Sequence, residues 1–332
     1  MSSEKLIVVL GATGNQGGSV VDTFLAEPGW KVRGITRNKD SVKAKSLEHR
    51  GVEVVEADMD QPATLVPAFQ DTHVIFAVSD FWGMYGDPEN QDKPAPGQSL
   101  GAWVSEKEAK QLRSVIDAGA EVPTLERFVF SSLSNATKWS KGKYTQVYHF
   151  DAKAQAEEYG ARNHPEFWAK TSIFQAGYFL SNFVSNSLTR PIKNSTGVIQ
   201  FIGNLDPDLK LPFIAAEEDS GPLVKALVND DPGRNLITYR EWLTFRELAQ
   251  AFTQATGVKA EVVQLPKGEF MSPLPEELKS ILEENWAYWN EYGYEARDDP
   301  TVIHPRDLKS PPELDSVINY LRKQDWEKVW TS

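Results

Sequence analysis

Three glycines at a fixed spacing give this sequence its clearest chemical signal. They are Gly11, Gly14 and Gly17, and they directly follow the apolar run 6–10. In a strand–turn–helix unit, the first such glycine permits the tight turn, the second lets a pyrophosphate approach the backbone, and the third lets the helix pack on the sheet. The N–H groups and the positive partial charge of the helix start then favour phosphate. The alternative is a turn that only reverses the chain, but such a turn rarely needs three glycines at this spacing.

The residues after the second expected strand, residues 31–36, indicate which dinucleotide this turn would hold. NAD sites place an Asp or Glu there for the ribose 2′-hydroxyl, whereas NADP sites use an Arg to hold the 2′-phosphate. This chain has Arg37 and Lys39. We therefore expect a planar guanidinium and a second positive charge at the phosphate of NADP(H). The alternative is that both are solvated residues of a surface turn.

A position after the strand expected at residues 52–56 extends this cofactor site. We expect Asp58 either to accept a hydrogen bond from the adenine amino group or to stabilise the turn in which it lies. The residues of the glycine turn that we expect to border the cofactor are Gly11, Thr13, Gly14, Asn15, Gln16 and Gly17.

Four segments of the chain together carry a family resemblance. They are residues 11–17 (GATGNQG), 79–83 (SDFWG), 125–137 (LERFVFSSLSNAT) and 148–153 (YHFDAK). On these segments the chain resembles the NmrA-like family of atypical short-chain dehydrogenase/reductases, and its fungal branch in particular, from about Lys5 to about Gln264. The resemblance implies a Rossmann core with a smaller C-terminal lobe, and NADP(H) binding. Some members of the family are reductases, whereas others resemble cofactor sensors that regulate partner proteins.

Short-chain dehydrogenases use a Tyr and a Lys that lie four residues apart on one helix face. The Tyr hydroxyl moves the proton, while the Lys holds the nicotinamide ribose and lowers the Tyr pKa. The resemblance matches Lys153 to the family lysine and implies the ribose role for it, rather than that of a surface residue. Four residues earlier stands His149. Three interpretations of His149 compete: a proton donor that titrates near neutrality, a polar residue over the nicotinamide, or a structural histidine at a helix start.

Polar side chains gather where the strand expected at residues 127–132 ends. Ser131 and Ser132 close this strand, at the carboxyl edge where open α/β sheets bind ligands. We expect Ser132 to polarise a substrate carbonyl, with Ser134 and Asn135 binding the substrate beside it. The alternative is that these residues only cap the strand end and its turn.

Aromatic residues lie in a segment predicted to be a long loop. Residues 80–98 are rich in Pro, Gly, Asp and Asn, and long loops in compact domains are usually functional or mobile. Phe81, Trp82 and Tyr85 lie near the expected nicotinamide end. We expect them to exclude water and to stack on a flat substrate, with Phe81 also beside the cofactor. The alternative is that these rings fill the gap between the two lobes.

An alternation of strands and helices positions these residues, and it predicts an α/β fold with a Rossmann-type, doubly wound parallel sheet. Expected strands are residues 6–10, 31–36, 52–56, 73–78, 127–132 and 172–175, and expected helices are 18–27, 102–118 and 152–163. After residue 190 we expect short strands of a smaller lobe at 198–202, 236–239 and 260–264, a capping box at Thr244 and Glu247, and helices at 278–292 and 312–329. We therefore expect an NADP(H)-binding Rossmann domain at residues 1–190 and a smaller α/β lobe for substrate or partner at 191–332, not fully separate from the first.

Composition excludes several classes of protein. The formal net charge of −12 disfavours direct binding to nucleic acid or to an anionic membrane. The chain has no cysteine, which excludes disulfides and thiolate metal sites, and its histidines show no metal-ligand spacing. No apolar stretch approaches the ~20 residues of a membrane span. We expect a cytoplasmic protein, with the nucleus as the alternative location.

These observations lead to two expectations about function. The first is an NADPH-dependent reductase of a small carbonyl, quinone or imine, in which Lys153 holds the ribose and the residues around Phe81 close the site. The second is a non-catalytic NADP(H) sensor that binds a protein partner, which the absence of the usual Tyr favours. A DNA-binding repressor is disfavoured by the negative charge.

Overall fold

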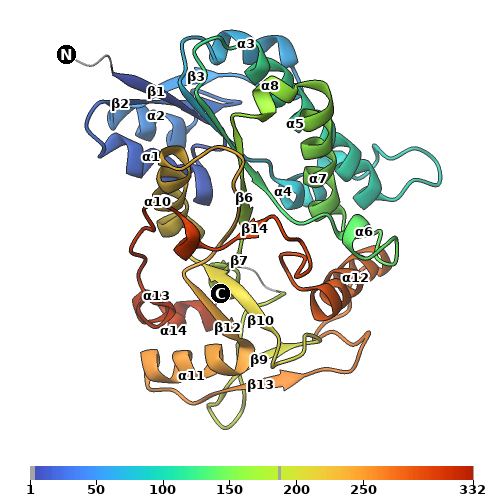
Figure 1. The fold of residues 1–332 in the computed structure, drawn as a ribbon. Coiled ribbons are helices and arrows are strands. Elements are labelled where there is room, and N and C mark those ends of the chain that lie inside the picture. Colours follow the sequence, from blue (N-terminus) through green and yellow to red (C-terminus); the bar gives the residue numbers. More distant parts are fainter. Residues whose placement is uncertain (1–3, 186–187, 332) are drawn as a thin grey trace.

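The computed structural model describes residues 4–185 and 188–331, and within them the main feature is an eight-stranded parallel sheet (Figure 1). Its strands, in sheet order, are β14 (Val302–Ile303), β11 (Asn235–Thr238), β6 (Thr171–Ala176), β5 (Arg127–Ser132), β4 (Val74–Ala77), β1 (Lys5–Val9), β2 (Trp30–Thr36) and β3 (Glu53–Glu56). The strand order reverses between β1 and β4. Ligands of open α/β sheets bind at such a switch point, outside the carboxyl ends of the strands.

Helices cover both faces of this sheet, because the central strands are apolar on both sides. Ile7, Val8 and Val9 of β1, for example, are completely buried. One face packs against α1 (Asn15–Leu25), α2 (Val42–His49) and α10 (Ala216–Asn229). The other face packs against α3 (Leu65–Ala68), α5 (Leu100–Ala120), α7 (Tyr148–Asn163) and α8 (Pro165–Trp168). The Rossmann-type fold class predicted from the sequence is therefore confirmed.

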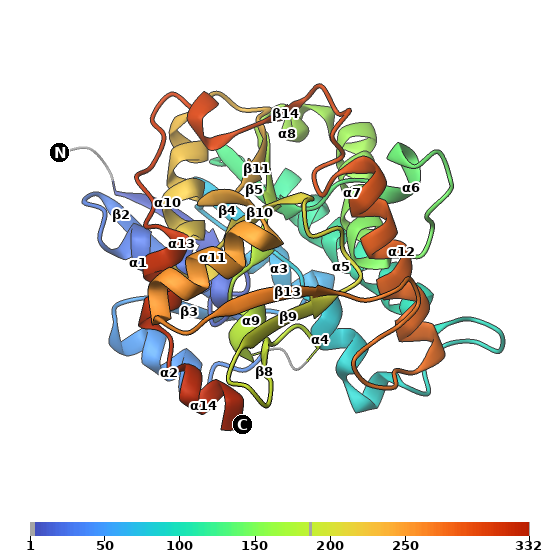
Figure 2. The ribbon, with the colours of Figure 1, turned by 90° about the horizontal axis from the view of Figure 1, so that it is seen from below.

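The smaller lobe lies beyond the carboxyl ends of these strands, and Figure 2 looks onto it from below. Its two small sheets are β12 (Glu241–Thr244), β10 (Lys210–Ile214) and β7 (Tyr178–Phe179), and β13 (Ala260–Gln264), β9 (Ile199–Gly203) and β8 (Ile192–Lys193). Its helices are α9 (Asn182–Ser185), α11 (Phe245–Thr256), α12 (Glu276–Tyr292), α13 (Val317–Lys323) and α14 (Trp326–Thr331). Thr244 and Glu247 form the expected capping box at the start of α11.

The chain after residue 190 does not build the smaller lobe alone. It returns to the large sheet as α10, β11 and β14. The strand predicted at residues 236–239 exists as β11, but its assignment to the smaller lobe was wrong, because it pairs in parallel with β6 of the main sheet. The contact of α10 with α1 is very close: the N–H of Gly221 donates to the Ser19 hydroxyl at 2.9 Å, and a Cβ on Gly221 would lie 2.1 Å from the Ser19 carbonyl oxygen.

Two other expectations about secondary structure were wrong. The segment 80–98 is not one long loop, because it contains the helix α4 (Phe81–Gly86) and a short 3-10 turn, Pro88–Asn90. Asp80 begins α4 by accepting a hydrogen bond from the N–H of Gly83 at 2.9 Å. The single helix expected at residues 312–329 is instead the two short helices α13 and α14, which are preceded by extended chain.

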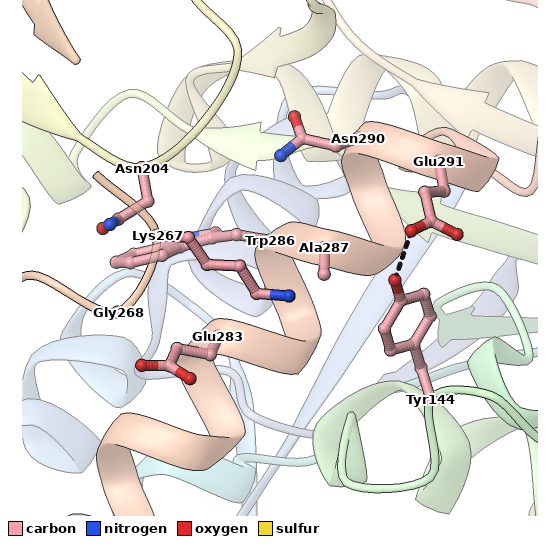
Figure 3. A pocket seen from close by; sticks show the side chains of 9 residues that line it. All are labelled: Tyr144, Asn204, Lys267, Gly268, Glu283, Trp286, Ala287, Asn290 and Glu291. Atoms are coloured by element: carbon pink, nitrogen blue, oxygen red, sulfur yellow. Dashed lines mark hydrogen bonds between the residues drawn. The ribbon is translucent and has the colours of Figure 1, made fainter. Parts of the chain in front are cut away.

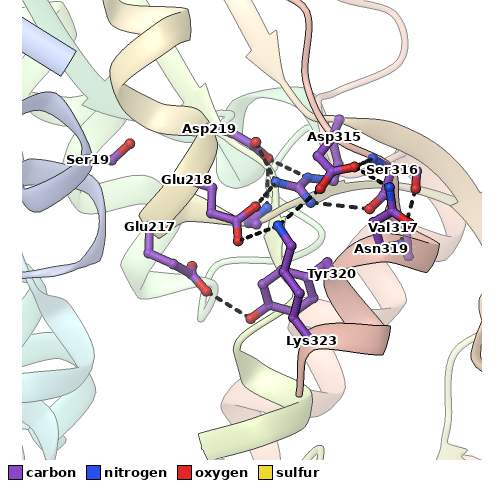
Figure 4. Close-up of polar contacts among 12 residues, drawn as sticks. Ser19, Glu217, Glu218, Asp219, Asp315, Ser316, Val317, Asn319, Tyr320 and Lys323 are labelled. Carbon is purple, nitrogen blue, oxygen red and sulfur yellow. Dashed lines mark hydrogen bonds and ion pairs between the residues drawn. The ribbon is translucent and has the colours of Figure 1, made fainter. Parts of the chain in front are cut away.

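A buried arginine joins the C-terminal segment to α10. The side chain of Arg240 is completely buried, and its guanidinium donates to both carboxylate oxygens of Asp219, at 2.6 and 2.8 Å, and to Glu218 at 2.8 Å. It also donates to the carbonyl oxygen of Ser316, just before α13, at 3.3 Å. Figure 4 shows how the acidic residues of α10 face the residues of α13 across this cluster. The arginine thereby fixes the end of the chain against the large lobe.

Candidate functional site

The glycine turn has an open surface in front of the first turn of α1. Gly11 has a φ of +63°, which favours glycine, and a Cβ on Gly17 would lie only 2.2 Å from the Gly11 carbonyl oxygen. A Cβ on Gly14 would meet nothing in the protein closer than 3.4 Å. Gly14 is the exposed N-cap of α1, and no side chain caps the helix there. Gly11 and Gly17 are therefore required by the turn itself, whereas Gly14 leaves room for a group from outside the chain.

The remaining residues of the turn lie at the same place. Thr13 is half-buried, and Asn15 is exposed at the first position of α1. Gln16 reaches the end of β5, where its side-chain oxygen accepts a hydrogen bond from the Ser131 hydroxyl at 2.8 Å. The structure thus links the phosphate turn to the strand that carries Ser131, across the switch point of the sheet.

The three residues expected at the adenosine end differ in whether their side chains already have partners within the protein. Arg37 and Lys39 are exposed just after β2, and the side chain of neither forms a salt bridge in the described chain. Asp58 has a local partner, because one of its carboxylate oxygens accepts a hydrogen bond from the N–H of Asp60 at 2.9 Å. This contact corresponds to the turn-stabilising interpretation of Asp58.

Lys153 is a buried residue that forms an ion pair the sequence analysis missed. Its ammonium lies 2.7 Å from a carboxylate oxygen of Glu108 on α5, and it also donates to the carbonyl oxygen of His149 at 3.2 Å. The same Glu108 oxygen accepts from the hydroxyl of Ser79, just after β4, at 2.7 Å. Lys153 is 7% exposed and Glu108 is completely buried, so the surface alternative for Lys153 was wrong.

A signal for Glu108 was present in the sequence. Glu108 is spaced four residues from both Val104 and Leu112, which are completely buried on the apolar face of α5. A carboxylate on that face has to be paired, since an unpaired buried charge is strongly destabilising. Its second carboxylate oxygen is buried without a hydrogen-bond partner in the described structure.

His149 lies beside Lys153 as a neutral ring. Burial and, to a lesser extent, the charge of Lys153 lower the pKa of His149 to about 3. This low pKa argues against the interpretation of His149 as a proton donor that titrates near neutrality. The Nδ1 atom of His149 is buried with no hydrogen-bond partner among the described residues. At neutral pH the imidazole can offer a hydrogen bond, but it does not hold the extra proton of an imidazolium acid.

Aromatic residues of α4 lie against His149, and we call these four rings the aromatic cluster: Phe81, Trp82, Tyr85 and His149. The ring of Trp82 lies 4.9 Å from that of His149, and the ring of Phe81 lies 5.8 Å from it. Tyr85 stacks on Phe81 at 6.0 Å. Phe81 is almost completely buried, whereas Trp82 is 39% exposed. The structure thus brings the expected aromatic residues together with His149 and Lys153.

The other predicted polar residues are not brought to this cluster. The Ser132 hydroxyl is buried and donates to Glu157 of α7, and burial raises the pKa of that carboxyl to about 8. Ser134 donates to the carbonyl oxygen of Tyr294 at 2.9 Å. Asn135 begins the short helix α6 (Ala136–Trp139) as its N-cap. These contacts agree with the alternative in which Ser134 and Asn135 only shape the turn after β5.

Two hollows lie elsewhere, and Trp286 of α12 lines both of them; Figure 3 shows the larger. The larger has a volume of about 200 Å³ and is lined by Tyr144, Asn204, Lys267, Gly268, Glu283, Trp286, Ala287, Asn290 and Glu291. The smaller is mainly apolar and includes Phe270 and Met271. None of the predicted site residues lines either hollow. In the described part of the chain, no helix is long and apolar enough to cross a membrane.

Known proteins are similar to this chain both in sequence and in fold. This chain is similar in sequence to the NmrA-like family domain-containing oxidoreductase hkm9 of Aspergillus hancockii. The two are 29% identical over 285 residues, which cover 81% of this chain and 77% of hkm9. The crystal structure of NmrA, a negative transcriptional regulator, in complex with NADP has a TM-score of 0.75 at 19% identity and covers 99% of this chain and 98% of its own. A second NmrA structure holds NAD.

An NADPH-dependent quinone oxidoreductase from Escherichia coli has the same fold, with a TM-score of 0.64 at 19% identity over 95% of this chain and 98% of its own. These structures agree with the nicotinamide dinucleotide cofactor expected from the sequence. The sequence model of the NmrA-like family matches residues 3–321. The chain therefore belongs to the NmrA-like family.

Proposed function

We propose that this protein is an NADPH-dependent reductase of a small carbonyl, quinone or imine. The observation that carries the proposal is the placement of the buried Lys153 of α7 beside the aromatic cluster. A lysine held in one place by Glu108 can orient a ribose, and partly exposed rings can hold a flat substrate.

The residues present fit NADP(H). The open surface at Gly14 and the uncapped start of α1 suit the pyrophosphate, since helix N–H groups bind phosphate oxygens. Arg37 and Lys39 are exposed and would hold the 2′-phosphate. Lys153 would hold the nicotinamide ribose, and Phe81 would lie beside the ring. When bound, the reduced nicotinamide supplies a hydride to the substrate.

The chain's own residues have three tasks in this scheme. Glu108 holds the Lys153 ammonium in one orientation, because the two groups share a short charge-assisted hydrogen bond. His149 offers a neutral N–H or ring nitrogen at the face of the cluster. Trp82 and Tyr85 limit access of water to the reacting atoms.

A second candidate is a non-catalytic NADP(H) sensor. The observation that favours it is His149 itself, which replaces the usual tyrosine and is neutral at physiological pH. The two candidates share the cofactor and differ in turnover, so one experiment separates them.

The test is to titrate the protein with NADPH by calorimetry and then to follow NADPH oxidation with quinones, aldehydes and cyclic imines. Turnover that falls at least about tenfold in Lys153→Met, and less in His149→Phe, supports the reductase. Lys110→Met, on the exposed side of α5, is the matched control. Tight NADPH binding without turnover on any substrate would replace the reductase by the sensor.

A further inference from the structure

The charges around the aromatic cluster are mainly negative. Asp80 carries its carboxylate at the start of α4, and Glu277 of α12 accepts hydrogen bonds from the N–H groups of Leu100 and Gly101 at the start of α5. The charge of Glu277 also contributes to the raised pKa of Tyr85. Lys153 is the basic group behind the cluster, and Glu108 neutralises its charge. In the part of the chain that the structure describes, no salt bridge brings a second Lys or Arg to these groups. Aromatic faces attract cations, and so do carboxylates, so the rings and the acidic residues here both favour a positively charged ligand.

The groups that might be expected to donate a proton are engaged elsewhere. Ser132 is hydrogen-bonded to Glu157 of α7, away from the cluster, and the Lys153 ammonium is bound to Glu108. His149 is neutral at physiological pH because of its burial. A carbonyl or quinone needs a proton as well as a hydride, and this cluster is poorly equipped to give one.

The hydroxyl of Tyr85 is the remaining acid within the cluster. Burial and, secondarily, the charge of Glu277 raise the pKa of Tyr85 to about 12. A phenol with that pKa holds its proton more firmly than an ordinary tyrosine, so it is a weak proton donor near neutrality.

We infer that the substrate is a planar iminium cation, held by the aromatic cluster of Phe81, Trp82, Tyr85 and His149. The inference rests on the proposed function, because the reductant is the reduced nicotinamide. The hydride adds two electrons and one hydrogen to the iminium carbon, and the electron pair of the C=N π bond becomes the lone pair of a neutral amine. NADPH becomes NADP⁺, and no proton is transferred. This reaction suits what the cluster offers, a surface that attracts cations and rings without a strong proton donor.

Cation selectivity is measurable without any turnover. Benzyltrimethylammonium, which cannot be reduced, and its uncharged isostere neopentylbenzene are titrated against cofactor-free and NADPH-loaded protein, with tryptophan fluorescence and calorimetry as readouts. We expect the cation to bind roughly three- to thirtyfold more tightly than the isostere. This preference should disappear in Trp82→Leu and persist in Trp139→Leu, which removes a partly buried tryptophan of α6 away from the cluster.

A second arm uses the reaction itself. N-methyl-3,4-dihydroisoquinolinium is a permanent iminium cation, and its kcat/KM should be independent of pH between about 6 and 9, because no acid takes part. Tyr85→Phe keeps the ring and removes only the hydroxyl, so its pH profile should stay equally flat. Menadione, a quinone, should be reduced more slowly. The inference is overturned if NADPH binds normally but the cation shows no preference over its isostere, or if Tyr85→Phe abolishes iminium reduction. If the protein prefers the cation but does not bind NADPH, the proposed reductase function is contradicted, whereas the cation-binding site is supported.

Discussion

Glu108 of α5 accepts hydrogen bonds from Lys153 and from Ser79 on one carboxylate oxygen, each at 2.7 Å, inside the protein. This contact ties the helix that carries the family lysine to the helix and strand end on the other side of the site. Lys153 therefore cannot be considered alone, because its position depends on Glu108.

Replacement of the carboxylate by an amide tests this dependence. Glu108→Gln keeps the shape but leaves the Lys153 charge without compensation, so the free energy of unfolding should fall by about 3 kcal/mol. The measurement is urea unfolding at neutral pH, with Glu106→Gln, an exposed position on the same helix, as the control. Equal stability of the two variants would mean that the buried pair contributes nothing.

Arg37 should decide between the two dinucleotides. If its guanidinium holds the 2′-phosphate, Arg37→Ala should weaken NADPH binding by about 1–3 kcal/mol and leave NADH binding nearly unchanged. Calorimetric titration of both cofactors measures this, and Lys43→Ala, an exposed residue of α2, is the control for a general loss of charge. Equal affinity of the native protein for NADPH and NADH would refute the assignment.

Gly14 and Gly17 of the phosphate turn should respond differently to the same substitution. Gly14→Val should fold, because the nearest atom to a Cβ there, the Gly11 carbonyl oxygen, is 3.4 Å away. The variant should lose NADPH binding, since its side chain would stand where the pyrophosphate approaches. Gly17→Val should destabilise the fold by roughly 2 kcal/mol or more, because its Cβ overlaps the Gly11 carbonyl. Circular dichroism and calorimetry separate these effects. Normal NADPH binding by folded Gly14→Val would show that the turn is only structural.

His149 should make the protein sensitive to acid. Its pKa is about 3 in the folded chain, against an ordinary value of 6.5, so its contribution to stability is complete above about pH 6.5 and is lost as the pH falls towards 3. Over that range the stability difference between the native protein and His149→Phe should change in favour of the variant, by at most about 1.4 kcal/mol per pH unit. A pH-independent difference for His149→Phe would show that its ring is not kept neutral by the fold.

Much of the large lobe was predictable because its signals are local. Each signal lies within a short stretch of chain: a run of five apolar residues, the glycine turn, and the polar residues at the ends of helices. The strand β5, for example, was predicted with its observed bounds, Arg127–Ser132. The helix α10 was missed, since Gly221 and Pro222 interrupt its pattern. The sheet membership of β11 was wrong because strand pairing over sixty residues leaves no local mark in the sequence.

The candidate site shows the same limit. Phe81, Trp82 and Lys153 were found from spacing and from the family resemblance, and the structure places them together. Glu108 was missed because a single acid in a long helix is usually exposed, and its pairing depends on contacts across 45 residues. Ser134 and Asn135 were assigned to the substrate, but they bond to α12 and α6, whose packing could not be anticipated.

The most direct test of the central claim is a crystal structure of the protein with NADP⁺. The account predicts that the pyrophosphate lies on the turn at Gly14, that Arg37 contacts the 2′-phosphate, and that Lys153 contacts the nicotinamide ribose while remaining paired with Glu108. The nicotinamide ring should then lie beside the aromatic cluster, with one face open to a substrate. A nicotinamide bound away from Lys153, or one covered on both faces by side chains, would contradict the account.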